Sequence, residues 1–501
     1  MPRWAFWLGV ALIFVGGLAL RTQTFTELWT GVHNAWGGAF YGNVARNFLR
    51  YGYWATAFAP VVNTGVVDPS QFEIYYHHPP LSIWLTSVSF HVFGVHEWSA
   101  RLPPLVFSLL TMGLVFAFAK AAYGKATALC ALLFIAVLPV EAYYATHVDT
   151  NSSASIFLTT LAVEAYRRWL IGGRDRDYFL CVVSVVFGCM TAWYTYLVIP
   201  PIFAHFWLIH RPTQSRAMRA RIWLLPAVAV LVFGLFLLHR EIALAGRAEV
   251  YDALADRVLK RTTQHGVDLI VIIKTYVRQI LTGYTLPFVG LTAAWIFLFL
   301  ADLRKRRMQL ADWCIAILLS YGFLYALAFP GHLLAHDFFV RPYAPGVALA
   351  SALVVVRAAG ALQRRLLRLA ALGVVVGGVC ALGTASTLRL YAADDRSNGH
   401  ILQGFGEVVA ALTAPSDAVF LPIREDRVLQ YYLDRPITFG LDTPDKLEAA
   451  AAKAITPYLI LVPERHAKMF PELLAYLKTR YSERREKGLI VYSNGGKRPG
   501  T

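Results

Sequence analysis

The chain has 501 residues, of which 57% are hydrophobic and 16% are charged, and its net charge at pH 7 is +16. An average soluble chain carries about a quarter charged residues, so the composition excludes an ordinary soluble protein and indicates one built for a lipid bilayer. The positive charge does not indicate nucleic-acid binding, because lysines and arginines lie between apolar runs instead of along one face. The cysteines also lie inside apolar runs without any metal-binding spacing, which is typical of packing residues.

Eleven apolar segments are predicted to span the membrane, since a helix of about twenty residues crosses the hydrocarbon core. The first follows Arg3 without a small-residue cleavage site, so we interpret it as an uncleaved helix. The count of eleven depends on dividing 178–209 into two spans. A single span there would place the C-terminal region on the cytoplasmic side of the membrane. The expected spans are 4–20, 102–119, 126–144, 151–166, 178–192, 196–209, 222–238, 284–300, 312–329, 338–356 and 369–386.

Lysine and arginine occur in alternate connections, and such short loops stay on the cytoplasmic side. The connections around residues 146–150, 191–195 and 330–337 contain neither residue and are predicted to face outside. Residues 240–283 are predicted to form an outer loop although several are basic, and this loop is expected to lie on the membrane surface or to meet an anionic ligand. The sequence thus predicts a multi-pass protein of the inner (plasma) membrane.

Two larger segments, residues 22–101 and 390–501, are predicted to lie outside the membrane on its extracytoplasmic face. The first contains amphipathic helices near 36–51 and 81–93. The second alternates helical patterns with short apolar strands, which indicates a small soluble α/β domain. It contains no glycine-rich nucleotide fingerprint, so no nucleotide cofactor is expected. The predicted domains are therefore a transmembrane domain over 1–389 and an extracytoplasmic domain over 390–501.

Histidines and one aspartate gather in these outer connections, where functional sites of membrane proteins often lie. His77 and His78 precede two prolines that fix their direction, so they are candidates to bind a metal or a phosphate oxygen, or else they face water in an interfacial turn. Asp149, next to His147, is a candidate helix cap and a candidate general base, and the two roles are compatible.

Two further groups have both a functional and an ordinary interpretation. His332 and His336 would lie one turn apart on a helix, followed by Asp337, which suits a metal site as well as an interfacial histidine pair. Arg46, Arg101 and Arg341 could each clamp a phosphate with their fork of donors or extend to lipid headgroups.

Several stretches together resemble the GT-C membrane glycosyltransferases, in the branch of protein O-mannosyltransferases and lipid A aminoarabinose transferase. The resemblance covers roughly residues 30–385. It rests on GGAFYGNVARNFLRYG, HHPPLSIWL, FGVHEWSARLPPLVFSLL, the segment that opens at Asp149, and HDFFVRPYAP. It implies the GT-C fold and the transfer of a sugar from a polyprenyl-phosphate carrier to a lipid, glycan or protein acceptor outside the membrane.

The chain departs from this family where the relatives carry an acidic pair before the first outer helix. His33 and Asn34 stand there instead, and His77 and His78 replace charged residues before the two prolines. The resemblance therefore shifts the expected base to Asp149, with His33, His77 and His78 as further catalytic candidates. It implies that lipid phosphate or substrate is bound by Tyr41, Arg46, Asn47, Arg101, His147 and Arg341, and that a divalent metal (Mg, Mn or Zn) is held by His77, His78, His336 and Asp337.

The expected reaction is attack by an acceptor hydroxyl or amine on the anomeric carbon, with inversion. Two alternatives remain open at this point. A transporter or flippase of lipid-linked sugars would also place polar groups at a membrane cavity, but it predicts internal repeats, and none is evident. An inactive relative that keeps the fold would lack transfer altogether.

Overall fold

The computed structural model describes residues 2–30, 33–75, 77–149, 153–210, 215–244, 269–394 and 398–493. The chain divides into two compact units. We call residues 1–26, 76–85 and 101–393 the helical unit. The mixed unit comprises residues 27–75, 86–100 and 394–501, so the C-terminal region groups with two parts of the segment 22–101. The domain boundary at residue 389 remains a prediction.

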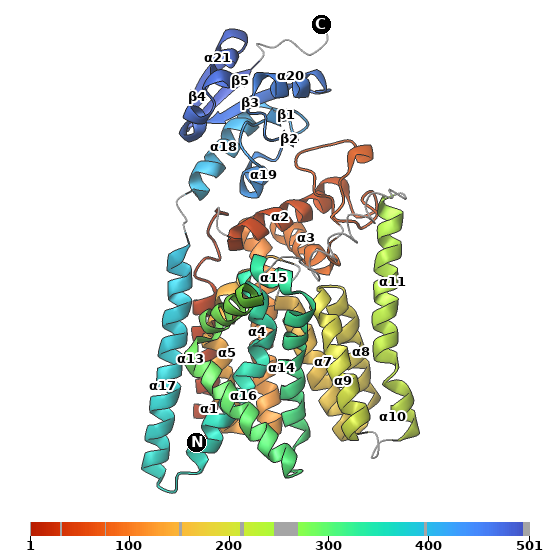
Figure 1. Cartoon of the computed structure of the whole chain (residues 1–501), viewed down its shortest axis with the longest axis vertical. Helices are drawn as coiled ribbons and strands as arrows, with labels where there is room; N and C mark the ends of the chain where they lie inside the picture. The colour runs from red at the N-terminus through yellow and green to blue at the C-terminus, as the bar shows by residue number, and fades with distance from the viewer. Residues whose placement is uncertain are drawn as a thin grey trace. The chain divides into compact units, whose positions relative to one another are not determined.

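The helical unit consists of helices, most of them apolar in sequence, several of which pack side by side (Figure 1). Its α-helices are α1 (Arg3–Arg21), most of α4 (Glu97–Tyr123), α5 (Lys125–Val137), α6 (Pro139–Tyr143), α7 (Ser153–Gly172), α8 (Asp175–Cys189), α9 (Ile199–His205), α10 (Arg216–Arg221), α11 (Leu224–Leu244), α13 (Leu269–Arg304), α14 (Leu310–Ala328), α15 (Pro330–Ala335), α16 (Ala344–Gly360) and α17 (Arg365–Ala393). Shorter helical turns are η2 (Tyr144–Thr146), η3 (Trp193–Val198), η4 (Phe206–His210) and η6 (Asp337–Tyr343).

Within the described residues, seven helices are long and apolar enough to cross a membrane. The count rises to eight if α5 and the segment after Pro139, which are bent by 60° from each other, are taken as one span. The bend follows from Pro139, which cannot continue the hydrogen-bond ladder of α5. These eight match eight of the eleven predicted spans. The other three predictions fall on α7, which carries Glu164, Arg167 and Arg168, on the 15-residue α8, and on the broken segment from η3 to η4.

The predicted outer loop 240–283 is helical at both of its ends, and its place outside the membrane remains a prediction. Residues 240–244 form the C-terminal end of α11. Residues 269–283 belong to α13, because their apolar run continues the helix toward the span predicted at 284–300. α13 is kinked where Thr285 adopts φ 58°, two residues before Pro287. Residues 245–268 of the predicted loop lie outside the described residues.

The mixed unit contains the predicted outer helices α2 (His33–Tyr51) and much of α3 (Leu81–Phe93), together with a small α/β fold. Its sheet has the order β2-β1-β3-β5-β4, with β1 parallel to β2 and β3, and β5 antiparallel to β3 and β4. The predicted α/β character is thus confirmed. The remaining elements are η1 (Pro69–Gln71), α18 (Gly399–Leu412), β1 (Ala418–Phe420), α19 (Arg427–Leu433), β2 (Ile437–Thr438), α20 (Pro444–Ala452), β3 (Tyr458–Pro463), η7 (Glu464–Met469), α21 (Pro471–Arg480), β4 (Ser482–Glu486) and β5 (Leu489–Ser493).

Candidate active site

His147 and Asp149 lie in the connection between η2 and α7, inside the helical unit. Both side chains are buried, and Nε2 of His147 lies 3.5 Å from Oδ2 of Asp149. The imidazole of His147 packs against the rings of Tyr144 and Phe338, at centroid distances of 5.4 and 5.0 Å. The aromatic rings therefore fix the imidazole, and the imidazole faces the carboxylate.

Burial alone would raise the pKa of Asp149. The contact with His147, together with the charges of His78 and His336, outweighs burial and holds the pKa of this carboxyl well below its usual range. Asp149 is therefore ionised at neutral pH. A carboxylate with a low pKa is a weak base toward an intact hydroxyl, but it orients a hydroxyl well and accepts its proton once that proton has become acidic.

His77 and His78 lie in a turn that is held by the region after α8. The indole of Trp193 donates to the carbonyl of His77 at 2.7 Å, and the backbone N–H of Leu81 donates to the carbonyl of Met190. His78 is buried, with its ring centroid 6.4 Å from that of Trp193. The chain bends at His77 and His78, and the burial of His78 contradicts the alternative in which this histidine faces water. His78 is also the member of the pair whose charge acts on Asp149.

His336 also acts on Asp149, but it is not part of a helical histidine pair. α15 ends at Ala335, and His336 is extended (φ −137°, ψ 122°), so the predicted one-turn spacing from His332 is wrong. The side chain of His332 lies outside the described residues. The ring of His336 stacks on Phe338 at 5.0 Å, whereas Asp337 is exposed.

The described side chains do not fit the predicted metal site. Among them, no three histidines, cysteines or carboxylates come close enough together to hold one ion. The mechanism proposed below therefore uses no metal.

Arg341 is buried in the helical unit and forms an ion pair with Glu141. Glu141 was not among the residues predicted from the sequence. Nε of Arg341 lies 3.0 Å from Oε2 of Glu141, and Nη2 donates to Oε1 of the same carboxylate at 3.3 Å. Nη2 also donates to Oγ of Ser153 at 2.6 Å, and this hydroxyl donates to the carbonyl of Ala145. Arg341 thus braces both ends of the connection that carries Asp149.

A second buried arginine extends this network. Nε of Arg21 donates to Oγ of Ser108 at 3.0 Å, and Ser108 donates to Oε1 of Glu141 at 3.1 Å. Arg21 also donates to the carbonyls of Ile135 and Ala136, which lie in the last turn of α5 and have no partner within that helix. The signal that could have found Glu141 is a carboxylate inside a predicted span, because such a charge needs a partner.

One donor of this network is left over. Nη1 of Arg341 is buried and has no hydrogen-bond partner among the described residues. It belongs to the same guanidinium that contacts Ser153, the first residue of α7, whose N-terminus carries a partial positive charge. Such a buried donor at a helix N-terminus suits an anion such as phosphate.

Three residues of the mixed unit that are predicted to bind substrate form hydrogen bonds with other residues of the same unit. Nη1 of Arg46 donates to the carbonyl of Tyr431 at 3.1 Å and lies 3.1 Å from Oδ1 of Asp434. The amide of Asn47 donates to the carbonyls of Val61 and Asn63. Tyr41 shares a hydrogen bond of 2.9 Å with Tyr75. The side chain of His33 lies outside the described residues.

Arg101, in the helical unit, is buried and donates to the carbonyl of Phe25 at 3.1 Å. Its predicted contact with phosphate, like those of Tyr41, Arg46 and Asn47, remains a prediction.

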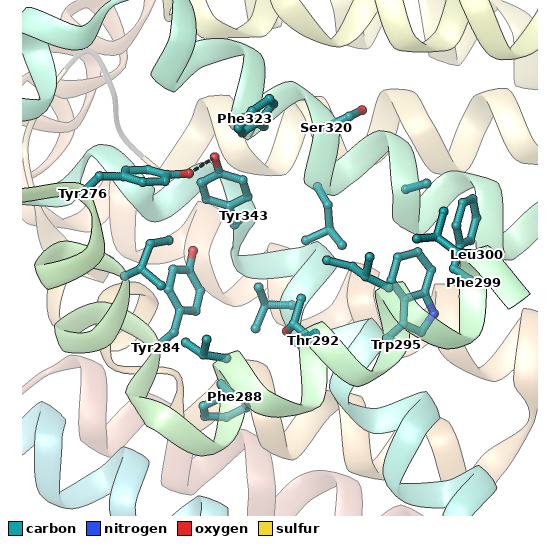
Figure 2. Close-up of a pocket in the computed structure, with 17 residues that line it drawn as sticks. Tyr276, Tyr284, Phe288, Thr292, Trp295, Phe299, Leu300, Ser320, Phe323 and Tyr343 are labelled. Carbon is teal, nitrogen blue, oxygen red and sulfur yellow. Dashed lines mark hydrogen bonds between the residues drawn. The ribbon is translucent and has the colours of Figure 1, made fainter. Parts of the chain in front are cut away.

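An apolar cavity of about 520 Å³ opens in the helical unit between α13, α14 and α16 (Figure 2). Tyr276 and Tyr343 share a hydrogen bond on its wall, and Tyr284, Phe288 and Trp295 line the side formed by α13. η6 connects the cavity with the buried ion pair, because it carries Tyr343 two residues after Arg341. A long apolar chain in this cavity would thus lie beside the segment that holds Arg341.

Comparisons with known proteins agree with this architecture. The family model of dolichyl-phosphate-mannose-protein mannosyltransferases matches residues 77–239. An uncharacterised protein of Aquifex aeolicus (strain VF5) is 23% identical over 178 residues, which are 35% of this chain and 33% of that protein. The chain thus spans about a third of the length of this curated relative.

Solved structures are similar over the whole chain. ArnT from Cupriavidus metallidurans bound to undecaprenyl phosphate has a TM-score of 0.69 at 14% identity, with 99% of each chain covered. The apo oligosaccharyltransferase of Archaeoglobus fulgidus has a TM-score of 0.59 at 13% identity, with 99% of this chain and 75% of that chain covered. The chain is therefore a multi-pass membrane protein with the GT-C fold, as the sequence predicts.

Proposed function

We propose that the chain is a glycosyltransferase that moves a sugar from a polyprenyl phosphate to an acceptor on the extracytoplasmic face of the inner membrane. The observation that carries the proposal is the buried, ionised Asp149, held by His147 in a fold shared with ArnT and the oligosaccharyltransferase. The solved ArnT structure contains undecaprenyl phosphate, which supports a carrier lipid of this class.

In the proposed reaction, an acceptor oxygen or nitrogen attacks the anomeric carbon as the bond from that carbon to the phosphate oxygen breaks. The bonding electrons leave with the polyprenyl phosphate. As the new bond forms, the acceptor proton becomes strongly acidic, so even a carboxylate with a low pKa can take it. Asp149 first orients the acceptor and then accepts this proton.

The leaving phosphate gains negative charge and needs fixed donors. Arg341 supplies Nη1, its buried free donor, beside the N-terminus of α7. The imidazoles of His78 and His336 add polar groups around Asp149. The isoprenoid chain occupies the apolar cavity along α13, because its aromatic walls match a hydrocarbon chain and η6 leads from them to Arg341.

The test is a transfer assay whose product does not depend on the acceptor. Purified protein is incubated with a panel of undecaprenyl-phosphoryl sugars and a cell-envelope fraction, and free undecaprenyl phosphate is measured. We expect release by the wild type, a loss of about a hundredfold or more in Asp149→Asn, and wild-type release by Asp302→Asn as a matched control at the end of α13. Full activity of Asp149→Asn would refute the assignment.

The alternatives give different outcomes in the same assay. A flippase would carry the lipid-linked sugar across vesicles without releasing undecaprenyl phosphate, and an inactive scaffold would release none under any condition. Treatment with EDTA addresses the metal: unchanged release fits Asp149 and Arg341 alone, whereas a loss restored by Mg²⁺, Mn²⁺ or Zn²⁺ would add a metal to the site.

A further inference from the structure

A basic pocket of about 570 Å³ lies at the opposite end of α7 from Asp149. It is formed where α7 ends at Gly172 and α8 begins at Asp175, two helices that pack side by side (Figure 1). α7 has 20 residues, and at 1.5 Å per residue it is about 30 Å long, which equals the thickness of the hydrocarbon core. The pocket is therefore separated from the candidate active site by about one membrane thickness.

Four arginines line the pocket, and two of them are partly neutralised. Arg167 donates twice to the carboxylate of Glu164, at 2.7 and 2.9 Å. Arg168 lies 3.1 Å from the same carboxylate and 3.9 Å from Asp177. The carboxylates of Glu164 and Asp177 thus partly neutralise Arg167 and Arg168.

The other two arginines, Arg174 and Arg176, are exposed, and in the described part of the chain neither forms an ion pair. Four guanidinium groups therefore face two carboxylates, which leaves positive charge for an anion. Arginine forks bind phosphate oxygens well.

The same pocket has apolar walls that point away from the protein. Ile171 and Phe179 are 66% and 68% exposed, as expected of apolar side chains that face lipid. A small free anion would gain nothing from these side chains. A lipid would place its headgroup on the arginines and its acyl chains along Ile171 and Phe179.

We propose that this pocket binds an anionic glycerophospholipid, with its phosphate held by Arg174 and Arg176 and its chains along Phe179. The site lies in the membrane leaflet opposite Asp149, so it is distinct from the proposed donor site and does not depend on the proposed reaction. The lipid would link the C-terminal end of α7 to the start of α8.

Native mass spectrometry of the full-length, delipidated protein in detergent tests the proposal, with phosphatidylglycerol as the probe and phosphatidylcholine as the neutral comparison. We expect the wild type to prefer phosphatidylglycerol. The double variant Arg174→Gln/Arg176→Gln should lose about tenfold or more in affinity. The control Arg364→Gln/Arg365→Gln removes the same charge from another exposed connection and should bind as the wild type does.

Two further arms separate a lipid from a free anion. Phe179→Ser should also weaken phosphatidylglycerol, and excess inorganic phosphate should not displace it. The proposal is overturned if both double variants lose affinity equally, or if Arg174→Gln/Arg176→Gln binds like the wild type. It is also overturned if the wild type binds both lipids equally, or if inorganic phosphate displaces the lipid while Phe179→Ser has no effect.

Discussion

Arg341 and Glu141, which are 200 positions apart in the chain, form a buried ion pair with 3.0 Å between Nε and Oε2. The pair joins η6 to α6, and through Ser153 it reaches the first turn of α7. A buried ion pair is weak evidence for stability, because desolvation of two charges offsets most of their attraction. Its position next to the connection of Asp149, with one donor left over, indicates a functional reason for keeping it.

This relationship predicts how single and paired substitutions differ. Arg341→Met or Glu141→Leu alone leaves one buried charge without its partner and should destabilise the fold by about 3–5 kcal/mol. The double variant Arg341→Met/Glu141→Leu leaves only Arg21 charged in this network, where it keeps its hydrogen bonds to Ser108 and to the carbonyls of Ile135 and Ala136. It should therefore be more stable than Glu141→Leu alone, which leaves two buried arginines without a carboxylate. Thermal unfolding of the purified protein measures this effect.

The activity of the double variant then separates the two roles of Arg341. If Nη1 binds the leaving phosphate, the stable double variant should still lose transfer by about a hundredfold, as happens when one fixed donor to a developing anion is removed. Recovery of both stability and transfer would mean that the pair serves folding only.

The fold was largely predictable because membrane spans depend on local composition. The helix at 81–93 was predicted with the bounds it has, and long apolar runs located the spans. The errors occur where local pattern competes with charge or proline: the loop predicted before residue 284 is helical as far as the kink at Thr285. The residues around Lys274 and Arg278 resemble a surface segment in sequence, because their charges interrupt the apolar run.

The candidate site was predictable only in part, because its geometry joins distant segments. Asp149, His147 and His78 were expected from their residue types, and the structure brings them together. Glu141 was missed because its partner is 200 positions away. The phosphate role of Arg46 remains a prediction, and its contacts with Tyr431 and Asp434 could not be foreseen because both partners come from the distant C-terminal region.

The contact between His147 and Asp149 predicts a shift in pH dependence. In His147→Ala, burial remains and raises the pKa of Asp149, while the contact that lowers it is lost. The acid limb of kcat/KM should therefore move to higher pH, so that the loss of activity grows as the pH falls. A pH–rate profile measures the shift, and His400→Ala, an exposed histidine on α18, serves as the control. An unchanged acid limb would contradict the electrostatic role of His147.

Asp434 predicts a pH-dependent stability of the mixed unit. Burial raises the pKa of Asp434, but Arg46 and Arg50 outweigh burial, so the pKa is lowered overall. Nη2 of Arg50 donates to both carboxylate oxygens at 2.7 Å. Because the folded-state pKa is lowered, the stabilisation is present above the unfolded value of about 3.9 and is lost as pH falls through the folded value. Asp434→Asn should therefore destabilise the unit by about 1–2 kcal/mol at pH 7 and progressively less below about pH 4.

Asparagine is a suitable replacement at this position, because Asp434 has a left-handed backbone (φ 46°, ψ 48°) that asparagine also adopts readily. Hydrogen exchange of the segment 427–438 in the full chain follows the effect. Asp442→Asn, which removes an exposed pair with Lys446, should change little. A loss for Asp434→Asn that does not depend on pH would contradict the ionic origin.

The apolar cavity offers a test through Gly322, which packs against the ring of Tyr343. A Cβ at Gly322 would lie 2.8 Å from Cε1 of Tyr343, so Gly322→Ala must displace this ring and disturb the cavity wall that it forms with Tyr276. Overpacking of this kind costs about 1–3 kcal/mol. If the isoprenoid chain lies in the cavity, the affinity for undecaprenyl phosphate should fall by about tenfold or more.

The control is Gly290→Ala, where no atom lies within 4 Å of the added Cβ, and this variant should bind undecaprenyl phosphate as the wild type does. Binding is measured by titration of the purified protein, and thermal unfolding checks that both variants remain folded. Equal affinity of the two folded variants would place the isoprenoid chain elsewhere.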